Sequence, residues 1–238
     1  MDAAVTSPSG MYGLRGGGPA ATFDTSPRTV TFADRRPLVL YPLSAESLCR
    51  LVEGWVFREQ VLRNGARQIT DVLLPGDVIP ASMLAPRSHG WETVACGEAR
   101  ILVYGRSSVL RSAALQRIRD RAIRAEVRSL RGRIVSLGRR DARARIAHLF
   151  CELHARLDRA GLVTRDGFGC PLTQEQIGDI LGLTSVHVNR TLMQLRAEGL
   201  LLVGRPQVVI KDLDGLRHVA GFVADAACQL GADDYGTF

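Results

Sequence analysis

The sequence predicts an α+β protein in which an N-terminal antiparallel β-roll precedes a long helix and a C-terminal winged helix-turn-helix. Three patterns predict this fold class: short β-rich runs between turn residues over 28–104, an apolar stripe without proline over 107–137, and two short helical patterns around a glycine over 171–203. A chain of 238 residues is long enough for two modest domains, each with its own core.

Residues 1–27 are rich in Gly, Ala, Ser, Thr and Pro. Such a segment buries too little apolar area to offset the entropy of ordering, so we expect a flexible N-terminal arm. Residues 28–106 are predicted as the β-roll, with Asn64-Gly65 as a hairpin turn. Enrichment in β-branched and aromatic residues places its strands at 28–32, 37–41, 48–59, 67–77 and 98–105.

Residues 107–138 are predicted as one long helix that begins at the capping residues Ser107 and Ser108 and ends in a hinge over 138–140. Apolar side chains recur every three or four residues, which is typical of the seam of a two-stranded coiled coil, and we therefore expect a homodimer. The alternative is an amphipathic helix that packs on its own β-roll. The seam residues are Ile118, Ala122, Ile123, Val127, Leu130, Ile134 and Leu137.

Residues 139–214 are predicted as the second domain, and 215–238 as a C-terminal tail. A helix over about 141–160 turns its apolar face to the core; its core residues are Ile146, Leu149, Phe150, Leu153 and Leu157. A shorter helix follows the N-cap Thr173, with Gln176 at the capping-box position, and ends at Gly182. The next helix follows the cap Thr184 and buries Val188, Leu192 and Leu195, and a hairpin wing is expected over 200–210.

The helix after Thr184 leaves an outward face of small and hydrogen-bonding residues at its start. These residues are Ser185, Val186, His187, Asn189 and Arg190. Such a face suits an approach to base edges in the major groove of DNA, whereas the alternative is a helical hairpin in an ordinary all-α core. Phosphate contacts are assigned to residues at helix N-termini and to the wing. They are Thr173, Gln174, Thr184, His187 and Arg205.

The run TQEQIGDILGLTSVHVNRTLMQLRAEGL, residues 173–200, resembles the DNA-binding region of the Crp/Fnr family of bacterial transcription regulators. The resemblance implies a cyclic-nucleotide-binding-like β-roll, a dimerisation helix and a homodimer that binds a palindromic operator in double-stranded DNA, with RNA polymerase as a further partner. It implies that Arg190 reads guanine, and that Ser185, Val186 and Asn189 fill the other base-facing positions. Many family members carry Glu where this chain has Val186, so we expect the half-site to differ there.

The β-roll departs from the ligand sites of the resembled family. A nucleotide-binding member carries a Gly-Glu pair and then an Arg soon after the turn that corresponds to 75–77; here Gly97-Glu98 comes too late, and Arg87-Ser88 lacks that pair. The five cysteines include none before Cys49 and no C-x-x-C, which argues against an iron–sulfur cluster and a disulfide framework. We therefore expect no cyclic nucleotide and no cofactor.

The remaining composition excludes several classes of protein. No apolar run approaches the roughly 18 residues that span a membrane, and the first residues do not form a secretory signal, so a cytoplasmic protein without membrane partners is expected. The net charge is +7, and Lys211 is the sole lysine. No nucleophile–base pair, phosphate loop or carboxylate dyad indicates an enzyme. His148-x-x-Cys151-x-x-His154 leaves a metal- or haem-dependent sensor as one alternative, and a protein-interaction module without DNA binding is the other.

Overall fold

The computed structural model describes residues 26–40, 43–81, 84, 91–165 and 167–223. The chain divides into two compact units. Unit 1 comprises the described residues of Met1–Gly65 and Asp71–Ser129, and unit 2 those of Ala66–Thr70 and Leu130–Phe238. The expected N-terminal arm, the Arg87-Ser88 pair and Cys228 lie wholly or almost wholly outside the described residues.

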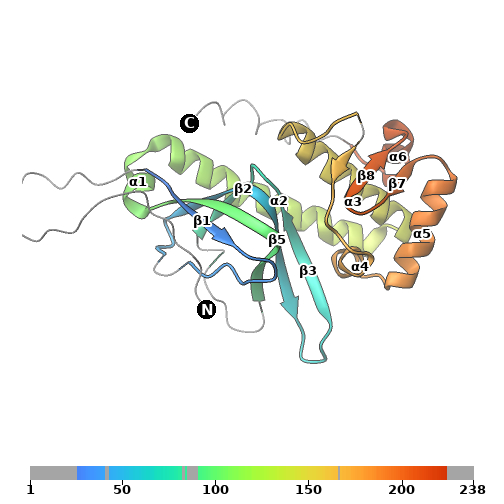
Figure 1. Cartoon of the computed structure of the whole chain (residues 1–238), viewed down its shortest axis with the longest axis horizontal. Helices are drawn as coiled ribbons and strands as arrows, with labels where there is room; N and C mark the ends of the chain where they lie inside the picture. The colour runs from blue at the N-terminus through green and yellow to red at the C-terminus, as the bar shows by residue number, and fades with distance from the viewer. Residues whose placement is uncertain (1–25, 41–42, 82–83, 85–90, 166, 224–238) are drawn as a thin grey trace, which may run out of the picture. The chain divides into compact units, whose positions relative to one another are not determined.

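Unit 1 is built around the antiparallel sheet that the sequence predicts (Figure 1). Its strands follow the order β1-β5-β2-β3, and β4 pairs with β2. The strands are β1 (Arg28–Phe32), β2 (Leu48–Val61), β3 (Arg67–Leu73), β4 (Val78–Pro80) and β5 (Trp91–Tyr104). Alternate apolar side chains form the core, among them Val30, Leu51, Val56, Ile79 and Ile101.

Three details of the sheet differ from the prediction. Residues 37–40 do not form a strand: Pro37 makes an isolated bridge to Val94, and the N–H of Val39 then donates back to the carbonyl of Pro37 at 2.9 Å, which closes a tight turn. Residue 41 lies outside the described residues. The strand predicted over 98–105 begins at Trp91, so Gly97-Glu98 lies in the middle of β5. β4, with three residues, is too short for a recognisable sequence pattern.

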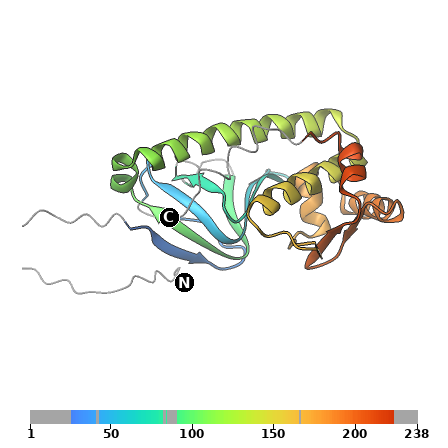
Figure 2. The same ribbon diagram turned by 90° about the horizontal axis from the view of Figure 1, so that it is seen from above.

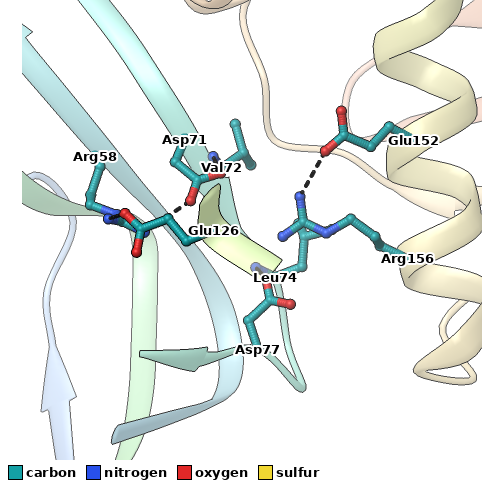
Figure 3. A network of polar contacts seen from close by, with 8 residues as sticks. All are labelled: Arg58, Asp71, Val72, Leu74, Asp77, Glu126, Glu152 and Arg156. Atoms are coloured by element: carbon teal, nitrogen blue, oxygen red, sulfur yellow. Dashed lines mark hydrogen bonds and ion pairs between the residues drawn. The ribbon is translucent and has the colours of Figure 1, made fainter. Parts of the chain in front are cut away.

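A buried ionic network ties the sheet of unit 1 to the long helix α2 (Ala113–Arg139). Arg58 of β2 lies between two carboxylates, Asp71 of β3 and Glu126 of α2 (Figure 3). One guanidinium nitrogen is 3.0 Å from Asp71, and another donates to Glu126. Because all three side chains are largely buried, this network fixes which face of α2 turns toward the sheet.

The single helix predicted over 107–138 is two helices, α1 (Arg106–Arg111) and α2 (Figure 2). Ser107 and Ser108 lie inside α1, whose N-cap is Gly105, so they are not the capping residues. The cap of α2 is Ser112, whose hydroxyl accepts a hydrogen bond from the N–H of Leu115 at 3.3 Å. The helix then continues through Gly138, the start of the predicted hinge.

The predicted apolar seam of α2 divides into two faces. Ile118 is buried, as the alternative of packing on the same chain requires. Farther along, Ile123, Val127, Leu130 and Ile134 are exposed, and Ile134 is 71% accessible. They recur at four- and three-residue steps, so one side of α2 carries a continuous apolar stripe. We call these four residues the α2 stripe.

Unit 2 combines the C-terminal turns of α2 with four helices and a small sheet (Figure 1). The helices are α3 (Ala142–Arg159), α4 (Gln174–Leu181), α5 (Ser185–Ala197) and α6 (Leu213–Ala220). The sheet has the order β6-β8-β7, from β6 (Phe168–Gly169), β8 (Gln207–Ile210) and β7 (Leu201–Val203). The core residues predicted on α3 are all buried. The expected tail begins inside α6, whose Leu216 and Ala220 are buried.

Among the described residues, none of the helices has both the length and the apolar character that crossing a membrane requires.

Candidate nucleic-acid interface

α4 forms as the sequence predicts, because both of its ends are specified locally. The hydroxyl of Thr173 accepts a hydrogen bond from the N–H of Gln176 at 3.0 Å, and the side chain of Gln176 accepts one from the N–H of Thr173 at 2.8 Å. Ile177, Ile180 and Leu181 are buried. The helix stops at Gly182, whose φ of 64° is left-handed and suits glycine.

The turn after α4 depends on a glycine that the sequence analysis did not single out. A Cβ on Gly178 would lie 2.4 Å from the carbonyl oxygen of Leu183, which is too close for any side chain. The same two residues form a hydrogen bond of 3.0 Å, from the N–H of Leu183 to the carbonyl of Gly178. The absence of a side chain at Gly178 thus lets the turn close tightly on α4 and fixes where α5 begins.

α5 begins after Thr184, whose hydroxyl accepts from the N–H of His187 at 3.2 Å. Its inner face is buried through Val188, Leu192 and Leu195, as predicted. Thr191 is also buried, and its hydroxyl donates to the carbonyl of His187 at 2.9 Å. The helix is therefore anchored along its whole inner face, and its outer face is available to a ligand.

The outer face of α5 carries the four residues predicted to contact bases. Ser185, Val186, Asn189 and Arg190 are all exposed, and Val186 is 77% accessible. His187 is half-buried and lies at the edge of this face. Met193, which the sequence analysis missed, is 66% accessible and lies one or two turns after Asn189 and Val186 on the same face. Its position at i+4 and i+7 from those residues is the signal that could have identified it.

The residues assigned to phosphate contacts lie at the start of α4, at the start of α5 and in the wing. Gln174, Thr184 and Arg205 are exposed, and Thr173 is half-buried. Arg205 occupies the turn between β7 and β8, as predicted, and donates to the carbonyl of Pro171 at 2.8 Å. This bond holds the wing turn beside the residues that lead into α4, so the charge of Arg205 lies near that helix N-terminus.

The C-terminal half of α5 is fixed to α3 by an ion pair. Arg143 donates to one carboxylate oxygen of Glu198 through two nitrogens, at 2.5 and 3.2 Å. This hydrogen bond, with a further one from Gln194, holds the pKa of Glu198 below its usual range. α3 thus contacts the C-terminal ends of both helices of the helix-turn-helix, because Arg145, also on α3, donates to the carbonyl of Leu181 at the end of α4.

The first residues of β3 belong to the same unit and contact the last turn of α4. Arg67 forms an ion pair with Asp179, at 2.6 Å between nitrogen and oxygen. The amide of Gln68 donates to the carbonyls of Asp179 at 2.6 Å and Ile180 at 3.2 Å. These carbonyls lie in the last turn of a helix, where main-chain donors run out, so Gln68 supplies the missing donor.

The possible metal ligands of α3 pack against other side chains of unit 2. Cys151 is buried, and burial raises the pKa of its thiol to about 12, which disfavours the thiolate that binds metals. The rings of His148 and His154 stack edge-on with Phe222 and Phe168, at centroid distances of 5.3 and 6.1 Å. Within the described part of the chain, no cluster of three His, Cys, Asp or Glu residues could hold a metal ion.

Comparison with known proteins gives consistent matches over both units. Residues 144–219 match the Crp-like helix-turn-helix domain. The chain is 30% identical over 162 residues to the nitrogen fixation regulation protein FixK of Bradyrhizobium diazoefficiens, covering 66% of this chain and 67% of that protein. It is 28% identical over 186 residues to the transcriptional activatory protein AadR of Rhodopseudomonas palustris, covering 76% of each.

The same fold occurs among solved structures. The structure of FixK2 from Bradyrhizobium japonicum matches with a TM-score of 0.69 and 26% sequence identity, covering 83% of this chain and 99% of that chain. A structure of CooA from Carboxydothermus hydrogenoformans matches with a TM-score of 0.62 over 82% of this chain at 20% identity, a likeness of fold.

Proposed function

Because the chain belongs to the Crp/Fnr family of transcription regulators and carries a helix-turn-helix DNA-binding domain, we propose that it acts as a homodimer on a palindromic operator in double-stranded DNA. The observation that carries this proposal is the asymmetry of α5. Its inner face is buried in unit 2, whereas its outer face presents exposed Ser185, Val186, Asn189 and Arg190. A helix of this kind fits the major groove with its N-terminal residues at the base edges.

The chemistry of the outer face suggests what each residue reads. Arg190 offers paired N–H donors that match O6 and N7 of guanine. Val186 cannot accept a hydrogen bond from cytosine, but its two methyl groups can pack on the methyl group of thymine. We therefore propose that the half-site contains a guanine opposite Arg190 and a thymine opposite Val186. Ser185 and Asn189 supply hydrogen bonds to the neighbouring bases.

Phosphate contacts position these readers without selecting sequence. The exposed side chains of Gln174, Thr184 and Arg205, with Thr173 and His187 beside them, surround the N-termini of α4 and α5. Helix N-termini favour anions because their N–H groups lack partners within the helix and the helix dipole is positive there.

The α2 stripe supports the homodimer. Its four apolar residues are exposed in the single chain, whereas Ile118, about 150° away around the same helix, is buried. A second copy of α2 would cover the stripe in a parallel coiled coil and place two helix-turn-helix elements on one duplex.

We further propose that the signal is neither a cyclic nucleotide nor an iron–sulfur cluster. Gly97-Glu98 is part of the strand β5, which leaves it far along the chain from the turn at 75–77. The four described cysteines are buried, and burial raises the pKa of the Cys49 thiol to about 12. Cluster ligands must be thiolates, which such an environment disfavours.

The decisive experiment is selection of operator sites from randomised duplexes by the full-length protein, followed by shift assays. We expect palindromic sites whose binding weakens steeply with salt, because phosphate contacts release counterions. Arg190→Ala should weaken binding by about 1–3 kcal/mol, roughly 5- to 150-fold, and relax the preference at one base pair of each half-site.

Arg159→Ala on α3 is the matched control, because it removes the same charge from a helix that does not carry the base-reading face. It should leave the selected sequence unchanged. Wild-type affinity and selectivity in Arg190→Ala would contradict the assignment of the reading residue. Failure of the wild type to bind any palindromic duplex would contradict the proposed function itself.

A further inference from the structure

One arginine at the start of α3 joins three separate segments of unit 2. Nε of Arg145 donates to the carbonyl of Arg140 at 2.9 Å, and Nη2 donates to the carbonyl of Leu137 at 2.8 Å. Nη1 donates to the carbonyl of Leu181 at 3.1 Å. A single guanidinium therefore contacts the last turn of α2, the link between α2 and α3, and the end of α4.

These carbonyls lie where main-chain donors run out. Leu137 is in the last turn of α2, and Leu181 is the final residue of α4, so for each carbonyl the residue four positions later lies outside the helix. Arginine suits the role because its planar group holds five N–H donors in fixed directions. Lysine would keep the charge but concentrate its donors at one nitrogen, which cannot span three carbonyls in different segments.

The link between α2 and α3 has only two residues, Arg140 and Asp141, and other contacts already restrain it. Asp141 caps α3 by accepting from the N–H of Ala144 at 2.8 Å. The side chain of Arg140 donates to the carbonyl of Ala220 in α6 at 3.2 Å. With Arg145 added, the segment predicted as a hinge is fixed to α3, α4 and α6 at the same time.

We propose that Arg145 is a positioning residue that sets the orientation of the helix-turn-helix relative to the end of α2. The α4–α5 pair moves as one body, because Gly178 and Leu183 hold the turn closed. A bond from Arg145 to the end of α4 thus fixes α5 as well. Since the proposed homodimer is joined through α2, this orientation determines the distance between the two reading helices.

The consequence, which rests on the proposed function, concerns the spacing of half-sites rather than their sequence. In the wild type, the bonds of Arg145 should make binding sharply dependent on the number of base pairs between the two half-sites. Without them, each helix-turn-helix should still read its own half-site through Arg190. The two readers would then tolerate other spacings at the expense of affinity at the optimum.

The test uses full-length wild type, Arg145→Lys and Arg145→Met, with Arg159→Lys as the matched control on the same helix. Duplexes carry the selected half-sites with spacers changed by one or two base pairs. The affinity ratio between optimal and altered spacing should fall about fivefold or more in Arg145→Lys. Base preference within the half-site should stay unchanged, and the control should keep the wild-type profile.

Hydrogen exchange measured on the same proteins without DNA gives a second readout. Amides over 138–144 should exchange faster in Arg145→Lys than in the control, because the link loses its side-chain donors. If Arg145→Met does not fold, Arg145→Lys still decides the question.

The inference would be overturned if Arg145→Lys kept the wild-type dependence of affinity on spacer length and the wild-type rates of hydrogen exchange. It would also be overturned by an equal loss of affinity at every spacing, which indicates a merely structural role. If the wild type binds no palindromic duplex, the proposed function fails, but the exchange measurement still tests the contacts of Arg145.

Discussion

Gly178→Ala tests the tight turn between α4 and α5 with a single methyl group. The new Cβ would lie 2.4 Å from the carbonyl oxygen of Leu183, about 1 Å inside an ordinary contact. The neighbour is a main-chain atom, so no side-chain rotation can relieve the clash. Relief requires the turn to move away from α4, which strains the hydrogen bond from Leu183 to Gly178.

The expected loss of stability follows from two opposing effects. Overpacking of this kind costs about 1–3 kcal/mol, and a main-chain clash belongs at the upper end. Replacing Gly by Ala inside a helix returns about 1 kcal/mol at most. We therefore expect the free energy of unfolding of unit 2 to fall by about 2 kcal/mol. For a unit of roughly 100 residues this corresponds to a decrease in Tm of about 10 °C.

Gly132→Ala is the control, because Gly132 lies inside α2 and, among the described residues, its added Cβ would have no atom within 4 Å beyond its chain neighbours and the adjacent helix backbone. It should gain helix propensity without a clash and raise stability by up to about 1 kcal/mol. Thermal and urea unfolding followed by circular dichroism measure both variants. A Tm for Gly178→Ala at or above that of the wild type would refute the argument, since it would mean that the turn accommodates a side chain.

Two further predictions concern the dimer and pH. Ile134→Glu places a carboxylate from each chain in the proposed seam, so the dissociation constant of the dimer should rise roughly 100-fold or more in sedimentation experiments. Ile134→Leu is the control and should keep the dimer. An unchanged dissociation constant in Ile134→Glu would mean that another surface forms the dimer. Burial, reinforced by Arg140 and opposed by Glu152, lowers the pKa of His148 below its usual 6.5. As the pH falls, the unfolded chain therefore takes up a proton at this residue before the folded chain does, and the free energy of unfolding decreases below about pH 6.5. Urea unfolding at about pH 7.5 and 5.5 should therefore show a smaller decrease for His148→Gln than for the wild type, and equal decreases would exclude His148 as the cause.

The helix-turn-helix could be predicted from the sequence because its signals are local. The capping box of Thr173 and Gln176 and the left-handed Gly182 mark the ends of α4 within ten residues of each other. The outer face of α5 follows from helical periodicity in the same way. Met193 was missed because an exposed methionine after a polar face resembles an ordinary surface residue until the buried face of the helix is known.

The errors in the β-roll and the long helix arise where distant partners decide the local structure. Ser107, Ser108 and Ser112 can all cap a helix, but Ser107 and Ser108 lie inside α1, where Ser108 is buried, and the hydroxyl of Ser112 accepts from the N–H of Leu115. The described part of the predicted strand, residues 37–40, has strand-forming residues, but within it the β-bridge to β5 is confined to Pro37. Neither the burial of Ser108 nor that pairing leaves a periodic pattern in the sequence.

The internal partners of the arginines likewise leave no pattern in the sequence. Arginine is abundant in this chain, yet several of the arginines that the structure describes bind within the protein. Arg58 joins two carboxylates, Arg67 pairs with Asp179, and Arg145 donates to main-chain carbonyls. An arginine that binds main-chain carbonyls has no acidic partner residue that a sequence pattern could reveal, so the sequence does not distinguish it from an arginine that binds DNA. The count of 31 basic residues consequently overstates the number of side chains free to contact phosphates, and exposure, as at Arg190, is a better guide to the proposed DNA-binding surface.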